Sequence, residues 1–361
     1  MPIRLDREVV TTTSGFAALA AEWDELHAAT PDASAYESWA FLFSWWQTHG
    51  DRYRLRLVTL REPGTGLLVG VLPLMAHRRR RLETLLLLVD NEPIDLLARP
   101  GWEPAVVTGA VRALRALPRW TLADLRPIRP GARMWQVHER WRGPREHAVV
   151  VREPHVAAVA EDEVLAALSR NHRSTLRRAL RRAADDGLEC RPAPVAEAAR
   201  AGARLVELHR ELWTDRDLDA SHGTEAFARF VTALAERVTA RGLGEVLEWT
   251  REGRVEVSAL LLRGPRSLYV HHVGASRHAV ERLQWSSLLV WEGLARARAL
   301  GRAELGLGYG NEGYKARWAS HEVPYERIRL GRGLLGHAFF GARRARHAVR
   351  RLRRRSGSGA Q

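Results

Sequence analysis

The chain has 361 residues, more than one hydrophobic core usually supports, so two lobes are expected. Its formal charge of +15 comes from 57 basic residues, of which all but one are arginine, against 42 acidic residues. This balance favours anionic partners such as nucleic acid, acidic lipid or phosphorylated intermediates. The single cysteine, Cys190, excludes an intramolecular disulfide and a thiol-based zinc site, and we expect no metal.

The first ten residues, MPIRLDREVV, mix charges of both signs and lack the apolar core of a signal peptide. The most apolar runs, 85–89 and 257–262, are far shorter than the roughly 18 residues that a membrane span needs. We therefore expect a cytoplasmic protein, either soluble or peripheral to a membrane.

The order helix, strand hairpin, helix, strand occurs twice along the chain. The first copy comprises residues 36–50, 54–76, 103–117 and 120–128. The second comprises residues 224–242, 244–264, 267–276, 285–301 and 302–308. This pattern predicts an α/β fold duplicated in tandem, with lobes at 1–155 and 156–330 and a tail at 331–361. The alternative is that any α/β chain shows a similar recurrence of helices and strands without a duplication.

Two arginine-rich helices are expected outside this repeat. In residues 169–187, Ser169 or Asn171 can cap the helix start and Gly187 can close its end. Apolar residues at helical spacing supply a buried stripe, and arginines cover the remaining surface. The tail carries nine arginines and no acid between Arg332 and Arg355, which predicts a basic amphipathic helix.

The only lysine of the chain, Lys315, lies in the segment GLGYGNEGYKARW (306–318). Gly308, Gly310 and Gly313 let the backbone turn tightly before Tyr314 and Lys315. A lysine presented from such a turn can neutralise a phosphate or a developing oxyanion as a compact point charge. The competing interpretation is that Lys315 is an exposed surface residue.

The arginine helix 169–187, the hairpin that leads to SLYVHHVGAS, the helix SSLLVWEGLARARALG and the segment GLGYGNEGYKARW together resemble GNAT-fold acyltransferases of the CelD-like and FemAB-like type. The resemblance covers about residues 160–320 well and the first half loosely. It implies two tandem GNAT-like lobes. The family's terminal aromatic-lysine pair resembles Tyr314 and Lys315 here, which implies that Lys315 is an electrostatic stabiliser in the transfer site.

The resemblance leaves the acyl donor open. GNAT enzymes that use acetyl-CoA usually hold its pyrophosphate with an Arg/Gln-x-x-Gly-x-Gly/Ala turn at a helix start. The matching place here has Arg282, then Trp285 at the first glycine position, then Ser286 and Ser287. These residues imply an altered site for acyl-CoA. FemAB-type relatives use aminoacyl-tRNA instead, and the positive charge of this chain suits that donor.

Candidates for proton transfer and substrate binding come from the second copy. Glu256 alternates with apolar neighbours on a strand and is a candidate general base, against a surface carboxylate paired with arginine. One of His271 and His272 must face the site, and His272 is the second candidate, against a buried core histidine. The predicted substrate-binding residues are Trp213, Arg173 and Arg177.

These features predict a GNAT-type N-acyltransferase. It would move an acetyl or aminoacyl group from acyl-CoA or aminoacyl-tRNA to an amine or hydroxyl of a cell-envelope or exopolysaccharide precursor. The alternative is a non-catalytic accessory protein of polysaccharide biosynthesis whose basic tail docks on an anionic membrane.

Overall fold

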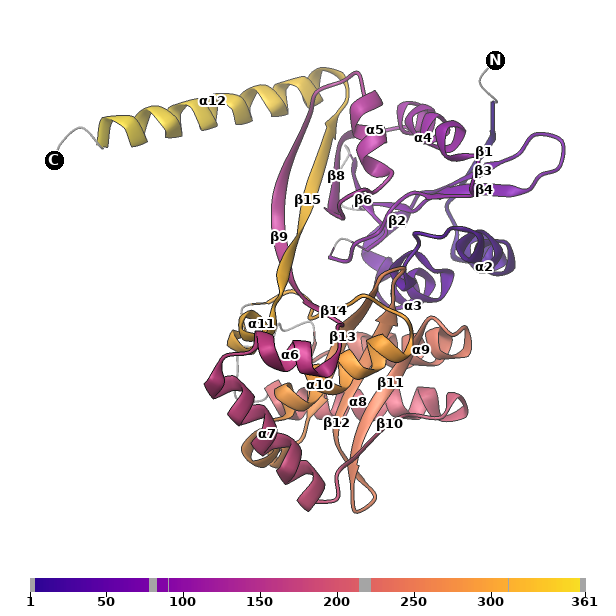
Figure 1. The fold of residues 1–361 in the computed structure, drawn as a ribbon. Coiled ribbons are helices and arrows are strands. Elements are labelled where there is room, and N and C mark those ends of the chain that lie inside the picture. The colour runs from indigo at the N-terminus through magenta and orange to yellow at the C-terminus, as the bar shows by residue number, and fades with distance from the viewer. Residues whose placement is uncertain (1–3, 78–82, 90, 214–221, 311, 358–361) are drawn as a thin grey trace. The chain divides into compact units, whose positions relative to one another are not determined.

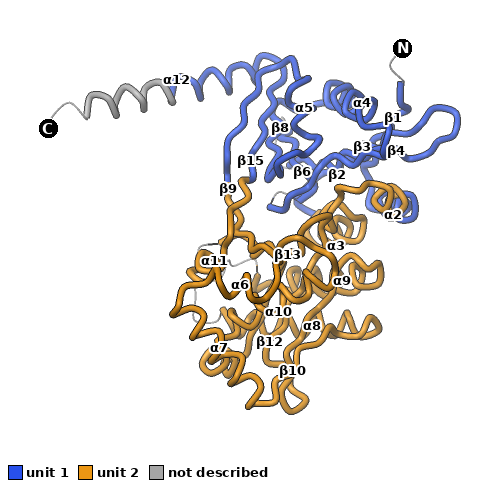
Figure 2. The backbone as a smooth tube through the Cα atoms, viewed as in Figure 1, with its two compact units in different colours: residues 1–22, 51–150, 325–361 blue, residues 23–50, 151–324 orange. Residues whose placement is uncertain are grey.

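The computed structural model describes residues 4–77, 83–89, 91–213, 222–310 and 312–357 (Figure 1). The chain forms two compact units (Figure 2). The first unit comprises residues 1–22, 51–150 and 325–361, and the second comprises residues 23–50 and 151–324. Both units combine helices with strands, which confirms the predicted α/β class.

The units differ from a simple division of the chain at residue 155. Residues 23–50 cluster with the second unit because helix α3 (Trp39–His49) packs on helix α9 (Glu225–Ala240). The rings of Phe41 and Phe230 meet edge to face, with 5.9 Å between their centroids. Residues 325–361 cluster with the first unit.

The first unit carries two groups of paired strands. Its strands are β1 (Asp6–Val10), β2 (Tyr53–Leu55), β3 (Leu57–Arg61), β4 (Leu68–Leu72), β5 (Leu74–His77), β6 (Glu83–Leu87), β7 (Leu97–Ala98), β8 (Trp120–Ile128) and parts of β9 (Arg145–Ala157) and β15 (His321–Gly331). Its helices are α1 (Thr13–Ala18), the start of α2 (Ala20–Ala29), α4 (Glu103–Ala116), α5 (Met134–Arg140) and α12 (Gly333–Gly357). Strands β1-β3-β4-β7 form an antiparallel sheet, and β15-β8-β6-β5-β2 are neighbours in that order. Among these pairs, β6 and β8 run parallel, and α4 connects them.

The second unit repeats this arrangement. Its strands are β10 (Glu189–Pro192), β11 (Gly244–Arg251), β12 (Arg254–Arg263), β13 (Ser267–Ala275), β14 (Glu304–Gly306) and the second part of β9. Its helices include α3, α6 (Glu161–Ala167), α7 (Arg170–Asp185), α8 (Ala198–Trp213), α9, α10 (Trp285–Ala299) and α11 (Gly313–Trp318). The strand order is β10-β11-β12-β13-β14-β9, with the parallel pair β13 and β14 connected by α10. The recurrence of a helix between two parallel strands confirms the predicted tandem fold.

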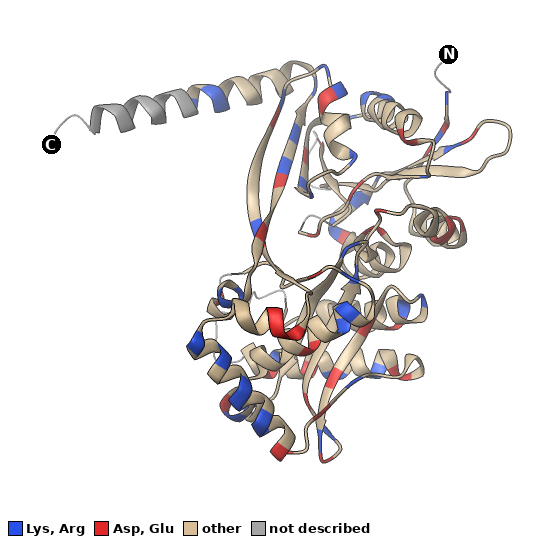
Figure 3. Cartoon of the chain, viewed as in Figure 1, with Lys and Arg blue, Asp and Glu red and all other residues tan. Residues whose placement is uncertain are grey.

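Short local signals explain several of these elements. The Ser169 hydroxyl accepts the backbone N–H of His172 at 3.2 Å and so caps α7, as predicted. Leu176, Ala179 and Ala183 form the buried side of this helix, and Gly187 follows its end with a positive φ of 61°. Arginines cover its other side (Figure 3).

The predicted tail helix is present as α12, which begins at Gly333 and ends at Gly357. The side chains of residues 347–361, and therefore most of its predicted arginine face, lie outside the described residues. Within the described part of the chain, none of the helices combines the length and apolar character needed to cross a membrane.

Candidate functional site

The parallel strands β13 and β14 are paired over only three residues. Ser267, Leu268 and Tyr269 are the register partners of Glu304, Leu305 and Gly306. Beyond Tyr269, strand β13 continues to Ala275, whereas β14 ends at Gly306. The two strands therefore part at their carboxyl ends, which is where open α/β sheets bind ligands.

Lys315 closes the turn that follows β14. Its side chain is only 7% exposed, so the surface interpretation of this residue is wrong. The Lys315 Nζ donates to the carbonyl of Tyr309 at 2.7 Å and contacts the carbonyl of Gly308 at 3.4 Å. It also forms an ion pair with Glu312 at 2.9 Å. An ammonium has three N–H groups, and these three acceptors match them.

This environment gives a structural reason for the one lysine in an arginine-rich chain. The two carbonyls and the carboxylate converge on a single nitrogen within one short turn. A planar guanidinium spreads its donors over a wider fork and does not satisfy such a set from one point. The predicted role of Lys315 in transfer stays a prediction.

The start of α10 departs from a glycine-rich anion-binding turn. Its N-cap residue, Gln284, is left-handed with φ 50°, and its side chain makes no capping hydrogen bond. Trp285 is buried, and its ring meets the ring of Tyr314 with centroids 5.9 Å apart. Neither Ser286 nor Ser287 caps this helix, because the N-cap position belongs to Gln284. Arg282 contributes its backbone carbonyl, which accepts from Arg182 Nη1 at 2.9 Å.

Tyr314 is set among apolar side chains at the same place. It packs against the core cluster that contains Trp318, which is 3% exposed. Burial, together with the Glu312 carboxylate, raises the pKa of the Tyr314 phenol. The phenol is therefore a hydrogen-bond donor at neutral pH rather than a base.

A buried histidine lies beside the point where the strands part, and the sequence analysis did not identify it. His155 of β9 is the register partner of Gly306 and is 1% exposed. Its Nε2 lies 3.2 Å from Glu153 Oε2, and its Nδ1 lies 3.2 Å from Glu304 Oε1. Glu153 Oε1 accepts the backbone N–H of Gly308 at 2.9 Å. His155 is thus linked through Glu153 to the turn that Lys315 closes.

The two carboxylates determine the charge of His155 in this arrangement. Burial lowers the pKa of His155, but the interactions with Glu153 and Glu304 outweigh it and raise the pKa to about 9. The same contact with His155 lowers the pKa of Glu304 to about 2, against the opposing effect of burial. One sequence signal pointed here: Glu153 and His155 are two apart on a strand and share a face.

Comparison with known proteins connects this geometry to a fold. Residues 170–316 match the family model of the acetyltransferase (GNAT) domain. The structure of FemX superposes with a TM-score of 0.59 at 12% identity, covering 90% of this chain and 96% of FemX. The chain has the GNAT fold. This confirms the resemblance drawn from the sequence and supports an acyltransferase in general terms.

Two further structures share this GNAT fold over nearly their whole length. L-PGS from Bacillus licheniformis has a TM-score of 0.57 at 10% identity, with 90% of this chain and 96% of that chain covered. The C-terminal domain of a putative lysylphosphatidylglycerol synthetase from Agrobacterium fabrum has a TM-score of 0.53 at 12% identity, with coverage of 91% and 96%. A search of curated protein sequences gives no match.

Within the GNAT domain, Glu256 is held by neighbouring groups. It is 1% exposed, and its Oε2 accepts a short hydrogen bond from the Ser276 hydroxyl. Its Oε1 lies 3.4 Å from Arg251 Nη2. The Ser276 hydroxyl in turn accepts the N–H of Ala279 at 3.1 Å. The structure thus gives Glu256 a positioning role in the turn after β13, and its role as a base stays a prediction.

His272 of β13 belongs to a group of histidines in the GNAT domain. Its ring lies 5.0 Å from Phe227 and 5.9 Å from His209 and from His222, between centroids. Burial and the neighbouring histidines lower its pKa well below the usual value. The imidazole is therefore neutral at pH 7, and the same surroundings make it a weak base. Trp213, at the end of α8, is partly buried against the core of the domain.

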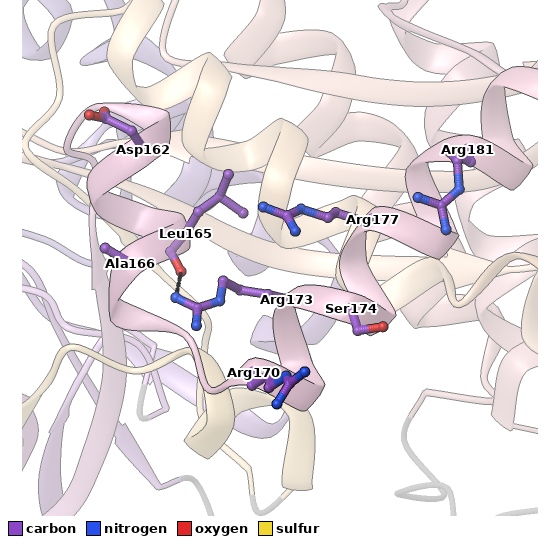
Figure 4. Close-up of a pocket in the computed structure, with 8 residues that line it drawn as sticks. All are labelled: Asp162, Leu165, Ala166, Arg170, Arg173, Ser174, Arg177 and Arg181. Carbon is purple, nitrogen blue, oxygen red and sulfur yellow. Dashed lines mark hydrogen bonds between the residues drawn. The ribbon is translucent and has the colours of Figure 1, made fainter.

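The predicted substrate residues Arg173 and Arg177 line an open groove between α6 and α7. The groove measures about 800 Å³, and its lining residues are Asp162, Leu165, Ala166, Arg170, Arg173, Ser174, Arg177 and Arg181. Figure 4 shows Arg173 and Arg177 reaching from α7 toward α6, where Arg173 Nη1 donates to the carbonyl of Leu165 at 3.2 Å. Four guanidinium groups against one carboxylate give this groove a positive charge, and its role in substrate binding stays a prediction.

Proposed function

We propose that the protein is an acyltransferase that moves an acyl or aminoacyl group to an amine or hydroxyl of a cell-envelope or exopolysaccharide precursor. The observation that carries the proposal is the parting of β13 and β14 beside a turn closed by a buried lysine. Parted strands expose backbone donors and acceptors that can orient an acyl group. The adjacent ammonium would favour negative charge on the carbonyl oxygen during transfer by exchanging its 3.4 Å contact with the Gly308 carbonyl for that oxygen.

The donor is a CoA thioester or an aminoacyl-tRNA, and two features favour the aminoacyl-tRNA. Trp285 fills the place of a permissive glycine and is buried against Tyr314, which removes a close approach of pyrophosphate to the start of α10. The arginine groove on α7 offers positive charge for a polyanion instead.

The acceptor must lose a proton during transfer. His272 is the group we assign to this step, because it lies on the part of β13 that extends beyond the pairing with β14. Glu256 is the second candidate and would act after releasing Ser276. One similar structure is that of a putative lysylphosphatidylglycerol synthetase, so a lipid headgroup hydroxyl belongs among the acceptors to test. We place the reaction in the cytoplasm, at the inner membrane face.

The decisive experiment measures donor binding and transfer together. Purified protein at low salt is titrated by calorimetry with acetyl-CoA, a longer acyl-CoA and charged tRNA, and each labelled donor is then incubated with a cell extract. We expect one donor to bind and to label an acceptor, and Lys315→Met to abolish the labelling. Arg317→Met is the matched control, because Arg317 is an exposed cation on the same helix, α11.

A non-catalytic accessory protein is the second candidate, and the buried Trp285 is the observation that favours it. This second candidate function predicts that none of the three donors binds, even at low salt. Deletion of residues after Arg332 would then abolish partitioning onto anionic liposomes, as expected if α12 docks on such a surface.

A further inference from the structure

Three potential metal ligands from separate segments meet at one edge of the second unit. They are His155 of β9, Glu304 of β14 and His321 at the start of β15, and one ligand atom from each lies within 4.8 Å of the others. His155 Nδ1 lies 3.2 Å from Glu304 Oε1, and His321 Nε2 lies 3.2 Å from Glu304 Oε2. The Glu304 carboxylate is therefore between two imidazoles.

The buried histidine in this group has no hydrogen bond of good geometry. Neither ring nitrogen of His155 has a well-aligned partner among the described residues, although carboxylate oxygens lie 3.2 Å away on both sides. Ligands around a tetrahedral metal are separated by about 3.3 Å when each metal–ligand bond is about 2.0 Å. The 3.2 Å separations thus fit two ligands that share a metal as well as they fit two hydrogen-bonded groups.

A second carboxylate, that of Glu153, lies on the other side of the His155 ring. Ligand histidines usually donate their other ring N–H to a carboxylate, which fixes the tautomer and the ring orientation. Glu153 Oε2 lies 3.2 Å from His155 Nε2, opposite to the nitrogen that faces Glu304. Glu153 is itself held by the backbone N–H of Gly308 at 2.9 Å.

We propose that His155 Nδ1, the Glu304 carboxylate and His321 Nε2 bind a Zn²⁺ ion, with water as the remaining ligand. Two imidazoles and a carboxylate suit zinc, and the two positive charges balance Glu304 and Glu153. The His321 side chain is 48% exposed, so it can move to close the site and the ion can enter from solvent. The ion would tie β9, β14 and the start of β15 together. This departs from the sequence-based expectation that the protein uses no metal.

The test uses the full-length protein after treatment with a chelator. Zn²⁺ is titrated against a chromophoric competitor, and Co²⁺ is titrated separately to obtain the visible spectrum of its coordination geometry. We expect one high-affinity ion and the strong visible absorption of tetrahedral Co²⁺. Loss of the exposed ligand in His321→Ala should weaken Zn²⁺ binding by at least about tenfold, as should Glu304→Gln, and Glu153→Gln should weaken it by about 10- to 100-fold.

His147→Ala is the matched control, because His147 is also about half exposed and also lies against a glutamate, Glu326. It should leave Zn²⁺ affinity unchanged. The group formed by His209, His222, His271 and His272 remains intact in all variants, so binding there would persist unchanged in His321→Ala. Equal affinity of the wild type and His321→Ala, or an absence of stoichiometric binding, would overturn the proposal and leave His155 as a protonated partner of two carboxylates.

Discussion

The two parallel strand pairs, β6/β8 in the first unit and β13/β14 in the second, are built alike but lie among differently balanced charges. In the first unit, Glu83 is buried and pairs with Arg54 at 2.8 Å and with Arg56 at 2.9 Å. The buried Asp95 accepts the backbone N–H groups of Arg133 and Met134 at 2.7 and 3.0 Å. Each of these acids thus has at least two donors, although burial still raises the pKa of Asp95.

In the second unit, the positive and negative groups near the parallel strands and on α7 are less evenly matched in number. One imidazole, His155, serves two carboxylates, Glu153 and Glu304, while the groove on α7 gathers four arginines around one acid. An excess of one sign in a confined place is stabilised by a ligand of the opposite sign. Buried acids of the second unit are also paired with arginines, as Glu248 is with Arg204 at 2.8 Å. We therefore infer that both units use buried charge for stability, and we propose that His155 and the α7 groove keep further charge available for binding.

The largest effect is expected where a buried charge in each unit is removed. Lys315→Met should lower the free energy of unfolding by about 3 kcal/mol, because two carbonyls and Glu312 lose a charged partner. Lys315→Arg should not restore it, since a guanidinium does not reach three acceptors from one point. Urea denaturation followed by circular dichroism measures both values.

Asp95→Asn is the counterpart of this change in the first unit. It should cost about 1 to 3 kcal/mol, because one of two accepted backbone hydrogen bonds is lost. Donor binding should survive in Asp95→Asn and fail in Lys315→Met at a temperature where both variants are folded. Loss of donor binding in both would remove the distinction between the units.

A second effect, also of about 3 kcal/mol, concerns pH. Burial lowers the pKa of His209 to about 4, although its hydrogen bond to the carbonyl of Val273 opposes this. Between pH 6.5 and about 4 the unfolded chain binds a proton that the folded chain does not, so stability is complete above pH 6.5 and falls as the pH falls. The loss from this residue should approach about 3 kcal/mol near pH 4.

His209→Asn should flatten this part of the stability profile, because an asparagine amide keeps a donor for Val273 and does not titrate there. Urea midpoints measured from pH 7.5 to pH 4.5 give the slopes. His337→Asn, at an exposed position on α12 in the first unit, serves as the control. A slope that is the same in His209→Asn as in the wild type would contradict the assignment.

A smaller effect is expected from an added methyl group in each unit. A Cβ on Gly306 would lie 2.8 Å from Tyr269 Cδ1 and 2.9 Å from Glu153 Oε1, and one on Gly70 would lie 2.6 Å from Val106 Cγ1. Both alanine variants should lose about 1 to 3 kcal/mol by overpacking. Only Gly306→Ala should also weaken Zn²⁺ binding, because it displaces Glu153. Gly313→Ala is the control, since its nearest contact is a flexible arginine end at 3.7 Å.

Much of the fold could be predicted because it depends on local patterns. The α7 helix follows from a serine cap and an apolar stripe, and the tandem order follows from alternating helical and strand periods. The boundary near residue 23 could not be predicted in this way. It depends on the packing of α3 against α9, which are separated by nearly 200 residues.

The candidate site was only partly predictable, because it also depends on contacts that form only in the folded chain. Lys315 was conspicuous through its rarity, but its burial depends on carbonyls that converge only once the turn has formed. His155, Glu304 and His321 come from three strands, and no short motif contains all of them. Strand register pairs Gly306 with His155 and Tyr269, and the backbone N–H of Ser320 donates to the carbonyl of His155 at 2.8 Å, so pairing between strands brings the three residues together.

The smallest effect tests the arginine groove and changes no buried group. Arg177→Ala should reduce the slope of log affinity for charged tRNA against log salt concentration by roughly 0.7, the value for one phosphate contact with a single strand. Arg178→Ala removes the same charge from the next position, which does not line the groove, and should leave the slope nearly unchanged. Both variants should keep their unfolding free energy within about 0.5 kcal/mol, because both side chains are exposed. Equal slopes for the two variants would mean that the net charge of the chain, rather than this groove, attracts the polyanion. The contrast between the two units would then depend on His155 and Lys315 alone.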